Sequence, residues 1–344
     1  MTALHNWYES DKTENEPIIS SRIRLARNLK GYNFQKMLSE EDAHKIIDNV
    51  HESIRYRAET SHSFDKYELS KLEQQMFLEK HIISPKFLLN KAPKAIYATK
   101  DKNISIMINE EDHVRIQAIY PGRDICSALS NANNIDDSLE QDLEFSFDSS
   151  LGYLTSCPTN VGTGMRASYL IHLPCLDKTG AIKKLFPHIA EQGLTLRGIY
   201  GEGTIPMGSI YQISNQATTG KSESQIIKNL DFETNNLIAQ ERYVMDKILS
   251  TRQNYLEDKA YRAHAILSAC RSISIKEAMN LLSDVRLGFV MGILDRPKPN
   301  EPMYKIMMSI QPGHLHINSD KIMDEPELDI VRADYLRSVF TIVK

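Results

Sequence analysis

The chain has 344 residues, enough for one large domain or two smaller ones, with the mixture of apolar and charged residues of a folded globular protein. Its 41 basic and 45 acidic residues leave a net charge of -4, which gives no overall field for nucleic acid or an anionic membrane. No apolar run approaches the roughly 20 residues of a membrane span, and the four cysteines form no C-x-x-C pair. We therefore expect a cytoplasmic protein with free thiols, without a nucleic-acid partner or membrane attachment.

The first predicted strand follows a polar segment, residues 1–17, which we expect to be a loosely held arm. Apolar and polar residues then alternate over residues 18–28, which places Arg22 and Arg24 on one face of a strand, about 7 Å apart. That spacing suits successive phosphates of a nucleotide. A solvated basic face on an edge strand would have the same pattern, so both interpretations stay open.

Two helices and three strands are predicted next. A cap at Ser39 opens one helix, and a second runs towards His81, which by itself suits a packing or surface position better than a functional one. Segments rich in isoleucine and valine predict neighbouring antiparallel strands at residues 95–99, 104–109 and 113–120. Three carboxylates lie in the turn Asn109-Glu-Glu-Asp-His113, just before Arg115. Taken alone, this pattern is typical of a solvated acidic turn.

The segment 151–166 follows a helical stretch at about 125–145 and reads as a short apolar strand entering a glycine-rich turn. Cys157 opens the turn and Arg166 ends it. Glycine lets backbone N–H groups approach a ligand closely, although an ordinary connection between strand and loop is the alternative. The segments that complete the sheet are strands at 168–173 and 210–215, with a helix at 181–192. In the segment 194–204 a strand runs into a glycine-bearing loop that carries Glu202.

The order of these elements predicts an α+β fold, a mostly antiparallel sheet flanked by helices and followed by an all-helical C-terminal domain. Helical spacing begins at Glu223, a capping box begins at Ser274, and the last helix is expected to begin at Glu325-Pro326. The predicted boundaries are an arm at 1–17, a catalytic domain at 18–235 and a helical domain at 236–344.

Common nucleotide motifs are excluded by spacing. Gly220-Lys-Ser lacks the first glycine of a P-loop, and Gly201-x-Gly203 lacks the third glycine of a dinucleotide or protein-kinase loop. The remaining candidates are five arginines at strand ends or turns, which would repel one another unless they neutralise a triphosphate with its magnesium. Two loop glutamates would suit a cationic substrate. These residues are Arg22, Arg24, Arg115, Arg166 and Arg197, with Glu111 and Glu202.

The sequence resembles the ATP:guanido phosphotransferases, the phosphagen kinases, whose signature C-P-[ST]-N-x-G-T is present as Cys157-Pro-Thr-Asn-Val-Gly-Thr163. The family resemblance covers about residues 18–235 and is also carried by Ser21-Arg22-x-Arg24, Asn109-Glu-Glu-Asp-His113-x-Arg115, Arg166-Ala-Ser168 and Arg197-Gly-x-x-Gly201-Glu202. Within that family the sequence looks most like the bacterial protein arginine kinases of the McsB type, on Ser20-Ser-Arg-Ile-Arg-Leu-Ala-Arg-Asn28, Arg197-Gly-Ile-Tyr-Gly-Glu-Gly-Thr204 and Gly220-Lys-Ser-Glu223. Arg22 also lies near the start, where phosphagen kinases place a helical domain first.

The resemblance implies a protein-arginine kinase that uses ATP and Mg²⁺ and marks stress regulators or damaged proteins for Clp-type proteolysis. It implies catalytic roles for Glu111 and Glu202, with Cys157 beside the substrate, and no metal ligands from the protein. One glutamate would act as base and the other would orient the guanidinium, in an order left open. The implied nucleotide-binding residues are Ser21, Arg22, Ile23, Arg24, His81, Arg115, Arg166, Ala167, Ser168, Tyr169, Leu170, Arg197, Gly198, Ile199, Tyr200 and Gly201.

Two departures from the family pattern bear on binding. Leu170 stands where the family has a histidine on the adenine side. The family's phosphoarginine pocket, Arg-Asp-x-x-Arg-Ala, is represented by Asp329, Arg332 and Ala333 without its first arginine, so activation by phosphoarginine is expected to be weak or absent. A simple i, i+3 surface pair of Asp329 and Arg332 is the alternative.

The resemblance also implies partners: a metal-binding activator protein, a heat-shock repressor as substrate, a Clp-type AAA+ protease and a second copy of the chain in a homodimer. Two other functions remain open, a phosphagen kinase for a small free guanidino compound and an adaptor that binds phosphoarginine without catalysis. The intact set of glutamates and arginines disfavours the adaptor.

Overall fold

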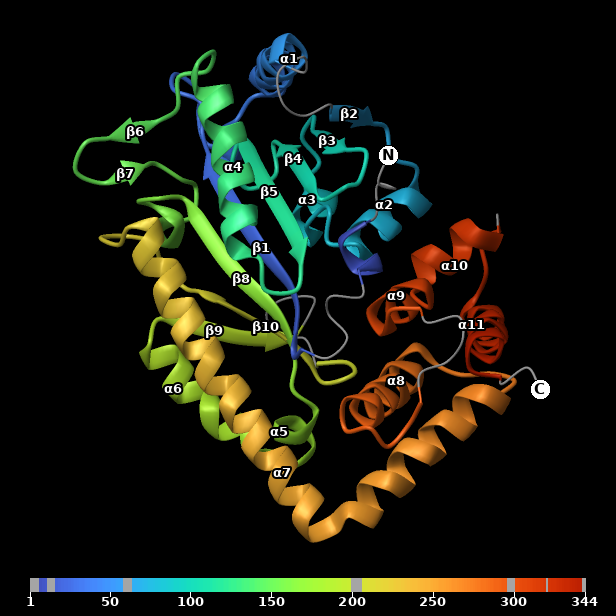
Figure 1. Ribbon diagram of the computed structural model, residues 1–344. Coiled ribbons are helices and arrows are strands. Elements are labelled where there is room, and N and C mark those ends of the chain that lie inside the picture. The colour runs from blue at the N-terminus through green and yellow to red at the C-terminus, as the bar shows by residue number, and fades with distance from the viewer. Residues whose placement is uncertain are drawn as a thin grey trace. The chain divides into compact units, whose positions relative to one another are not determined.

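The computed structural model describes residues 6–10, 16–57, 64–198, 206–295, 301–319 and 321–341. It confirms the α+β class, with an eight-stranded sheet in the order β2-β3-β4-β5-β1-β8-β10-β9 (Figure 1). These strands are β1 Ile18–Arg27, β2 Phe64–Tyr67, β3 Ala95–Thr99, β4 Ile104–Ile108, β5 Val114–Pro121, β8 Met165–His172, β9 Leu194–Gly198 and β10 Ile210–Asn215. A small separate sheet pairs β6 Phe147–Asp148 with β7 Gly152–Tyr153.

The helices divide between the sheet region and the C-terminal region. Those of the sheet region are α1 Glu40–Arg57, α2 Lys71–Glu79, α3 Pro85–Leu89, α4 Ile125–Glu140, α5 Pro174–Lys178 and α6 Leu185–Glu191. The C-terminal helices are α7 Glu223–Ala269, α8 Ile275–Val290, α9 Met303–Ser309, α10 Pro312–Ser319 and α11 Glu325–Phe340. No helix in the described ranges combines the length and the apolar composition that crossing a lipid bilayer requires.

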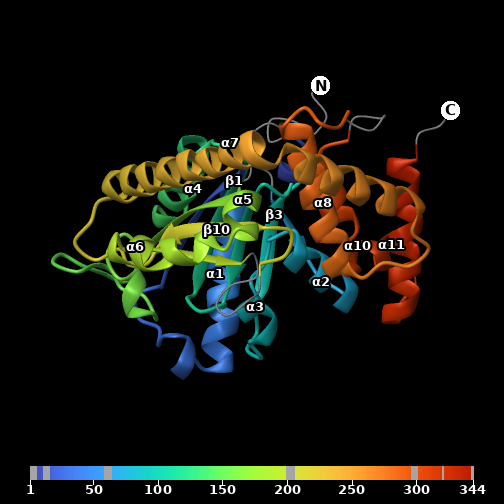
Figure 2. The same cartoon turned by 90° about the horizontal axis from the view of Figure 1, so that it is seen from below.

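The chain forms two compact units. Of the described residues, the first contains those within 1–7, 20–168 and 214–231, and the second contains those within 8–19, 169–213 and 232–344. In the first unit, α4 covers the face of the sheet at β5 and packs on α1 (Figure 1). In the second unit, α10 packs between α9 and α11 (Figure 1), and Figure 2 shows α8, α10 and α11 grouped together.

The predicted β-strands of the first unit are confirmed. β3 pairs antiparallel with β4, with Ala95 opposite Ile108, and β4 pairs antiparallel with β5, with Ile104 opposite Ala118. All residues of β3 and β4 are buried, which explains why their sequences are nearly continuous apolar runs. β5 also pairs antiparallel with β1, so the strand carrying Arg22 lies beside the strand carrying Arg115.

The N-terminal arm is not loosely held where the structure describes it. Trp7 is 2% exposed, its ring lies 6.1 Å from the ring of His81, and its Nε1 donates to the carbonyl of Lys80 at 3.3 Å. Tyr8 is also buried. The prediction gave weight to the charged residues of the arm and overlooked its two adjacent aromatic side chains, which bury large apolar areas.

A buried ion pair joins the end of β1 to α4. Arg27 is 2% exposed and donates from Nε and Nη2 to Oδ2 of Asp136, at 3.1 and 2.5 Å. Its Cζ lies 3.5 Å above the centre of the Tyr153 ring, and its Nη1 donates to the carbonyl of Thr163 at 3.0 Å. Arg27 therefore connects the core of the sheet to the glycine-rich turn.

The predicted starts of α8 and α11 are confirmed. The Ser274 side chain accepts from the backbone N–H of Glu277 at the start of α8, and Asp324 forms a capping box with Glu327 at the start of α11. The boundary expected after residue 235 falls inside α7, whose helical geometry is interrupted at Arg252. Helical periodicity continues through residue 235, so the sequence carries no signal for a break there.

In the second unit, buried polar contacts join α8 to the end of β8 and to the segment before β1. Arg286 of α8 donates to Nδ1 of His172 at 2.6 Å and to the carbonyl of Glu16 at 2.7 Å, while Nε2 of His172 lies 2.8 Å from the hydroxyl of Ser283. Burial, followed by the charge of Arg286, holds the pKa of His172 well below its ordinary value. A neutral ring can accept at Nδ1 and donate at Nε2, as these contacts require.

Candidate active site

Four of the five arginines singled out by sequence lie together in the first unit. Arg22 and Arg24 are half-buried on β1, while the intervening Ile23 is fully buried, as strand alternation requires. Burial lowers the pKa of Arg24 well below its ordinary value, and like charges lower it further. Those charges belong to Arg22, Arg115 and Arg166, in descending order of effect. Such a concentration of guanidinium groups suits a bound polyanion.

His81 lies beside this cluster. Its backbone is left-handed, with φ +58°, two residues after the end of α2, and its carbonyl accepts from the Gln117 side chain at 2.6 Å. Burial, followed by the charges of Arg22 and Arg24, lowers the pKa of His81 to about 3. The ring is therefore neutral at physiological pH and adds no further positive charge to the cluster.

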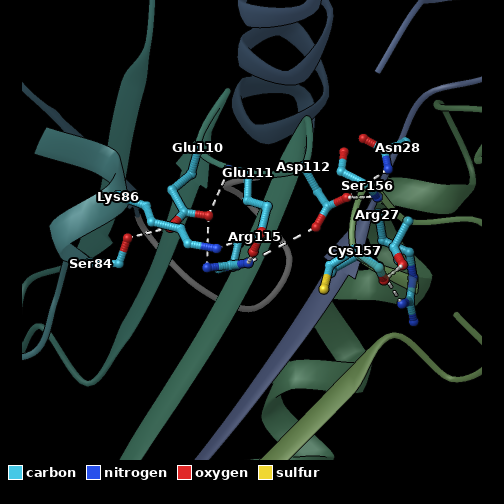
Figure 3. Close-up of polar contacts among 12 residues, drawn as sticks. Arg27, Asn28, Ser84, Lys86, Glu110, Glu111, Asp112, Arg115, Ser156 and Cys157 are labelled. Carbon is cyan, nitrogen blue, oxygen red and sulfur yellow. Dashed lines mark hydrogen bonds and ion pairs between the residues drawn. The ribbon is translucent and has the colours of Figure 1, made fainter. Parts of the chain in front are cut away.

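The turn between β4 and β5 places three carboxylates around Arg115 (Figure 3). Nη1 of Arg115 lies 2.7 Å from Glu110, and Nη2 lies 3.1 Å from Glu111 and 3.9 Å from Asp112. Although burial lowers it, the three carboxylates raise the pKa of Arg115 above its ordinary value. The positive charge of Arg115 is thus balanced by carboxylates of the protein itself.

Glu110 is the structural centre of this turn, although no feature of the sequence distinguishes it from its acidic neighbours. Its carboxylate is buried, accepts from the backbone N–H of Glu111 at 2.6 Å and is hydrogen-bonded by the Ser84 hydroxyl. The neighbouring Glu111 is more exposed, with 23% of its side chain accessible. The interpretation of a solvated acidic turn is therefore wrong for Glu110, and only Glu111 presents an accessible carboxylate.

Asp112 connects the acidic turn to the glycine-rich turn. Its Oδ1 accepts from the side chain of Asn28 at 2.8 Å and from the backbone N–H of Ser156 at 2.7 Å. Asn28 also donates to the carbonyl of Leu154 at 3.1 Å. Cys157 follows directly, is half-buried, and places its Sγ 3.1 Å from the hydroxyl of Thr159. The hydrogen bonds of Asp112 and Asn28 thus hold the turn that carries Cys157 next to the turn that carries Glu111.

Gly162 closes the glycine-rich turn against β7. Its backbone exchanges hydrogen bonds with Tyr153, at 2.8 and 3.3 Å, and its φ of +120° lies in a region that residues with a Cβ rarely adopt. A Cβ at this position would lie 3.0 Å from the carbonyl oxygen of Thr218. The signature glycine is therefore required both by backbone conformation and by close approach of another segment.

Replacing Gly162 with alanine is expected to reduce the free energy of unfolding by at least the roughly 1–3 kcal/mol that a strained backbone costs, because the contact of the added Cβ with Thr218 increases the loss. Urea denaturation measures the effect. Gly31→Ala is the matched control, since Gly31 has φ +87° but no neighbour within 4 Å of its added Cβ. Equal losses in the two variants would show that the close approach contributes nothing.

The remaining predicted nucleotide-binding residues lie in different places. Ser21 is buried and uses its hydroxyl to donate to the Gly122 carbonyl and accept from the Asp124 backbone, at 2.7 and 2.8 Å. Arg197 and Gly198 end β9 in the second unit. Ala167, Ser168, Tyr169 and Leu170 are buried on β8. Ile199, Tyr200, Gly201 and Glu202 lie outside the described residues.

The candidate phosphoarginine residues lie on α11. Arg332 is fully buried and donates to the carbonyls of Ile310 and Ile273, at 3.0 and 2.8 Å, as well as to Asp329 at 2.5 Å. Ala333 is also fully buried. The interpretation of Asp329 and Arg332 as a simple surface pair is therefore wrong, because the guanidinium joins α11 to two other segments of the helical region.

The geometry of the first unit suits two charged ligands of opposite sign. The arginine cluster provides donors for phosphate oxygens, and Glu111 provides acceptors for a cation. Although burial raises it, hydrogen bonds and charges from Lys86 and Arg115 lower the pKa of Glu111 below its ordinary value. Glu111 is therefore ionised at neutral pH. Within the described ranges, no group of three His, Cys, Asp or Glu side chains is arranged to hold a metal ion.

Two family models match the chain. The ATP:guanido phosphotransferase C-terminal catalytic domain matches residues 37–244, and the C-terminal domain of protein-arginine kinase McsB matches residues 253–344. The interval between the two matches contains Arg252, where the helical geometry of α7 is interrupted.

Curated relatives match over nearly the whole chain. A protein-arginine kinase of Bacillus licheniformis is 42% identical, covering 97% of this chain and 93% of the relative. One of Pelotomaculum thermopropionicum is 41% identical, covering 98% and 96%.

Solved structures support the same fold. Lombricine kinase has a TM-score of 0.60 and 23% identity, covering 71% of this chain and 70% of that one. A duplicated taurocyamine kinase of Schistosoma mansoni has a TM-score of 0.62 and 20% identity, covering 77% and 39%. These two structures share the fold of this chain. The family models and the curated relatives establish that the chain belongs to the ATP:guanido phosphotransferase family, in its protein-arginine kinase branch, and is an ATP-dependent kinase.

Proposed function

We propose that this kinase transfers the γ-phosphoryl group of ATP to arginine side chains of proteins. The observation that carries the proposal is the position of an accessible, ionised carboxylate, Glu111, bonded to a member of the arginine cluster. A phosphate-binding site and a guanidinium-binding group are thus adjacent in one unit. The names of the curated relatives support arginine in proteins as the acceptor.

The proposed chemistry follows from the charges of the two groups. Arg22, Arg24 and Arg166 would bind the phosphates and stabilise the negative charge that spreads over the transferred phosphoryl oxygens, without having to reorganise. Mg²⁺ bound with ATP would neutralise part of the phosphate charge, held by the phosphate oxygens together with at most one or two protein carboxylates. The arginine cluster fits such a nucleotide because its guanidinium groups supply N–H donors for the phosphate oxygens.

The acceptor guanidinium must lose a proton as it attacks, since its pKa lies above 12. Glu111 would bind the planar group through paired N–H to carboxylate hydrogen bonds and is one of the two candidates for the base. Glu202 is the other. Cys157, held near the acidic turn through Asp112, would lie beside the acceptor.

The proposed biological role is the marking of stress regulators or damaged proteins for Clp-type proteolysis. A metal-binding activator, a heat-shock repressor as substrate and a second copy of the chain are the partners that the family resemblance implies. These partners are part of the proposal.

The test is incubation of the purified protein with Mg-ATP and either free arginine or an unstructured arginine-rich protein, followed by detection of acid-labile phosphate. We expect label on the protein and none on free arginine, with the label lost in the Glu111→Gln variant. Label on the free amino acid would instead favour a phosphagen kinase. If neither acceptor is labelled even with an activator protein present, the phosphoarginine-binding adaptor becomes the better hypothesis.

A further inference from the structure

The short helix α3 is fastened to the acidic turn at both of its ends. At its start, Ser84 accepts from the backbone N–H of Phe87 at 3.1 Å and also bonds Glu110 through its hydroxyl. At its end, the Asn90 side chain donates to the carbonyls of Asn109 and Glu110, at 2.7 and 3.1 Å. The position of α3 over the turn is therefore fixed by side chains of both segments.

A lysine completes this attachment at the C-terminal end of α3. The Lys94 ammonium donates to the carbonyls of Phe87, Leu88 and Asn90, at 2.5, 3.2 and 2.6 Å. These are carbonyls that a helix leaves unsatisfied at its end, and a cation there also complements the helix dipole. Such a short helix would not hold its shape alone, so these contacts are what keeps its exposed residues in place.

Lys86 is the residue of α3 that this arrangement aims at the candidate substrate carboxylate. Its Nζ lies 2.5 Å from Oε1 of Glu111, and Figure 3 shows the side chain extending from α3 towards that group. The other oxygen of Glu111, Oε2, lies 3.1 Å from Arg115. Both carboxylate oxygens thus already interact with cations of the protein.

A substrate guanidinium needs the same oxygens. Paired hydrogen bonds to a carboxylate use both of its oxygens, so the Lys86 ammonium lies where one N–H of an arginine would bind. Lys86 is 62% exposed, whereas Arg115 is 8% exposed and also bonded to the buried Glu110. The exposed lysine is the partner that can leave, since exposed ion pairs are weak and readily rehydrated.

We propose that Lys86 is a specificity-determining residue that competes with the substrate arginine for Glu111. This inference rests on the proposed function, because it treats Glu111 as the group that binds the acceptor. In the unliganded protein Lys86 neutralises Glu111, and an incoming guanidinium replaces it by offering two hydrogen bonds in a plane. A substrate lysine is another ammonium and cannot pair with both carboxylate oxygens in one plane, so it has no advantage over Lys86 and the contact favours arginine over lysine.

The test measures equilibrium binding of a fluorescent, unstructured peptide with a single arginine to the full-length protein. In Lys86→Met the dissociation constant at neutral pH is expected to fall about threefold to fivefold, the range of an exposed ion pair. In Lys86→Arg, which keeps a cation, it is expected to stay equal to that of the wild type or to rise. Lys30→Met is the matched control, because Lys30 is 64% exposed and paired with Glu144, and it should leave the constant unchanged.

The pH dependence of binding provides a second readout. The charged groups that face Glu111 are Lys86 from α3 and Arg115 from β5, with Glu110 and Asp112 adjacent in the turn. Both cations favour the ionised carboxylate, so removing Lys86 raises the pKa of Glu111. The loss of peptide binding on acidification should therefore begin at higher pH in Lys86→Met than in the wild type.

The outcomes separate this inference from the proposed function. An unchanged or larger dissociation constant in Lys86→Met would overturn the competition, even if the protein phosphorylates arginine normally. A smaller dissociation constant in Lys86→Met, together with a loss of peptide binding that begins at higher pH than in the wild type, would support the competition. A lack of phosphoryl transfer by the wild-type protein would count against the proposed function alone, because the binding measurement does not depend on transfer.

Discussion

Replacing Arg24 with alanine is expected to lower kcat for phosphoryl transfer by about 10³-fold or more, the range found when an arginine that stabilises a phosphoryl transition state is lost. Arg24 lies on β1 among the positive charges of Arg22, Arg115 and Arg166. A guanidinium fixed in this position meets the developing charge without reorganisation, and water that fills the space cannot do so. Steady-state kinetics with Mg-ATP and an arginine-rich protein measure the loss.

Thermal unfolding of the same variant separates function from folding. Because burial and like charges both disfavour the Arg24 cation, its removal is expected to leave the Tm unchanged or to raise it. Lys45→Met serves as the control for charge removal, since Lys45 is an exposed residue paired with Glu41 on α1. If kcat fell by less than tenfold in Arg24→Ala, phosphate stabilisation by this residue would be excluded.

Replacing Arg27 with methionine is expected to reduce the free energy of unfolding by about 3–5 kcal/mol, because Asp136 would remain buried without its charged partner. The side chains of this pair are 2% and 6% exposed, so water cannot replace the lost interaction. The contact of the guanidinium with the Tyr153 ring and its bond to Thr163 are lost as well. Denaturation by urea measures the change.

The pH dependence of this loss has a definite sign. Burial raises the pKa of Asp136, and Arg27 opposes that increase, so the pKa rises further when Arg27 is removed. The deficit of Arg27→Met relative to the wild type should therefore shrink as the pH falls and Asp136 becomes protonated. The double variant Arg27→Met, Asp136→Leu should recover part of the stability at neutral pH. Recovery in neither condition would contradict the ion pair as the cause.

The strands and the arginine positions on them could be predicted because both depend on local periodicity. Alternation over residues 18–28 placed Arg22 and Arg24 on one face, and the structure has both half-buried on β1. The cap at Ser274 marks a helix start for the same reason, since a cap satisfies backbone groups within four residues, and Glu325-Pro326 marks the start of α11. Arg115 lies near these arginines because β5 pairs with β1. The spacing of residues along the chain does not predict that pairing.

The parts that sequence reasoning missed depend on contacts between distant segments. Glu110 and Glu111 are adjacent acidic residues, and nothing local indicates that the first is buried against Ser84 and Arg115 while the second faces outward. The partnership of Asn28 with Asp112 spans 84 residues. For the N-terminal arm, the sequence does contain a signal for burial, the adjacent aromatic residues Trp7 and Tyr8. The charged residues around them favoured the opposite prediction.

The single oxygen of Asp112 that joins two turns also constrains how this protein can evolve. Oδ1 bonds the side chain of Asn28 and the backbone of Ser156, so a substitution at position 28 or 112 leaves a buried polar partner unsatisfied. Positions 28 and 112 are therefore epistatic, and a route that changes one before the other passes through a less stable intermediate. Position 156 is under less constraint from this bond, since any residue except proline supplies the backbone N–H.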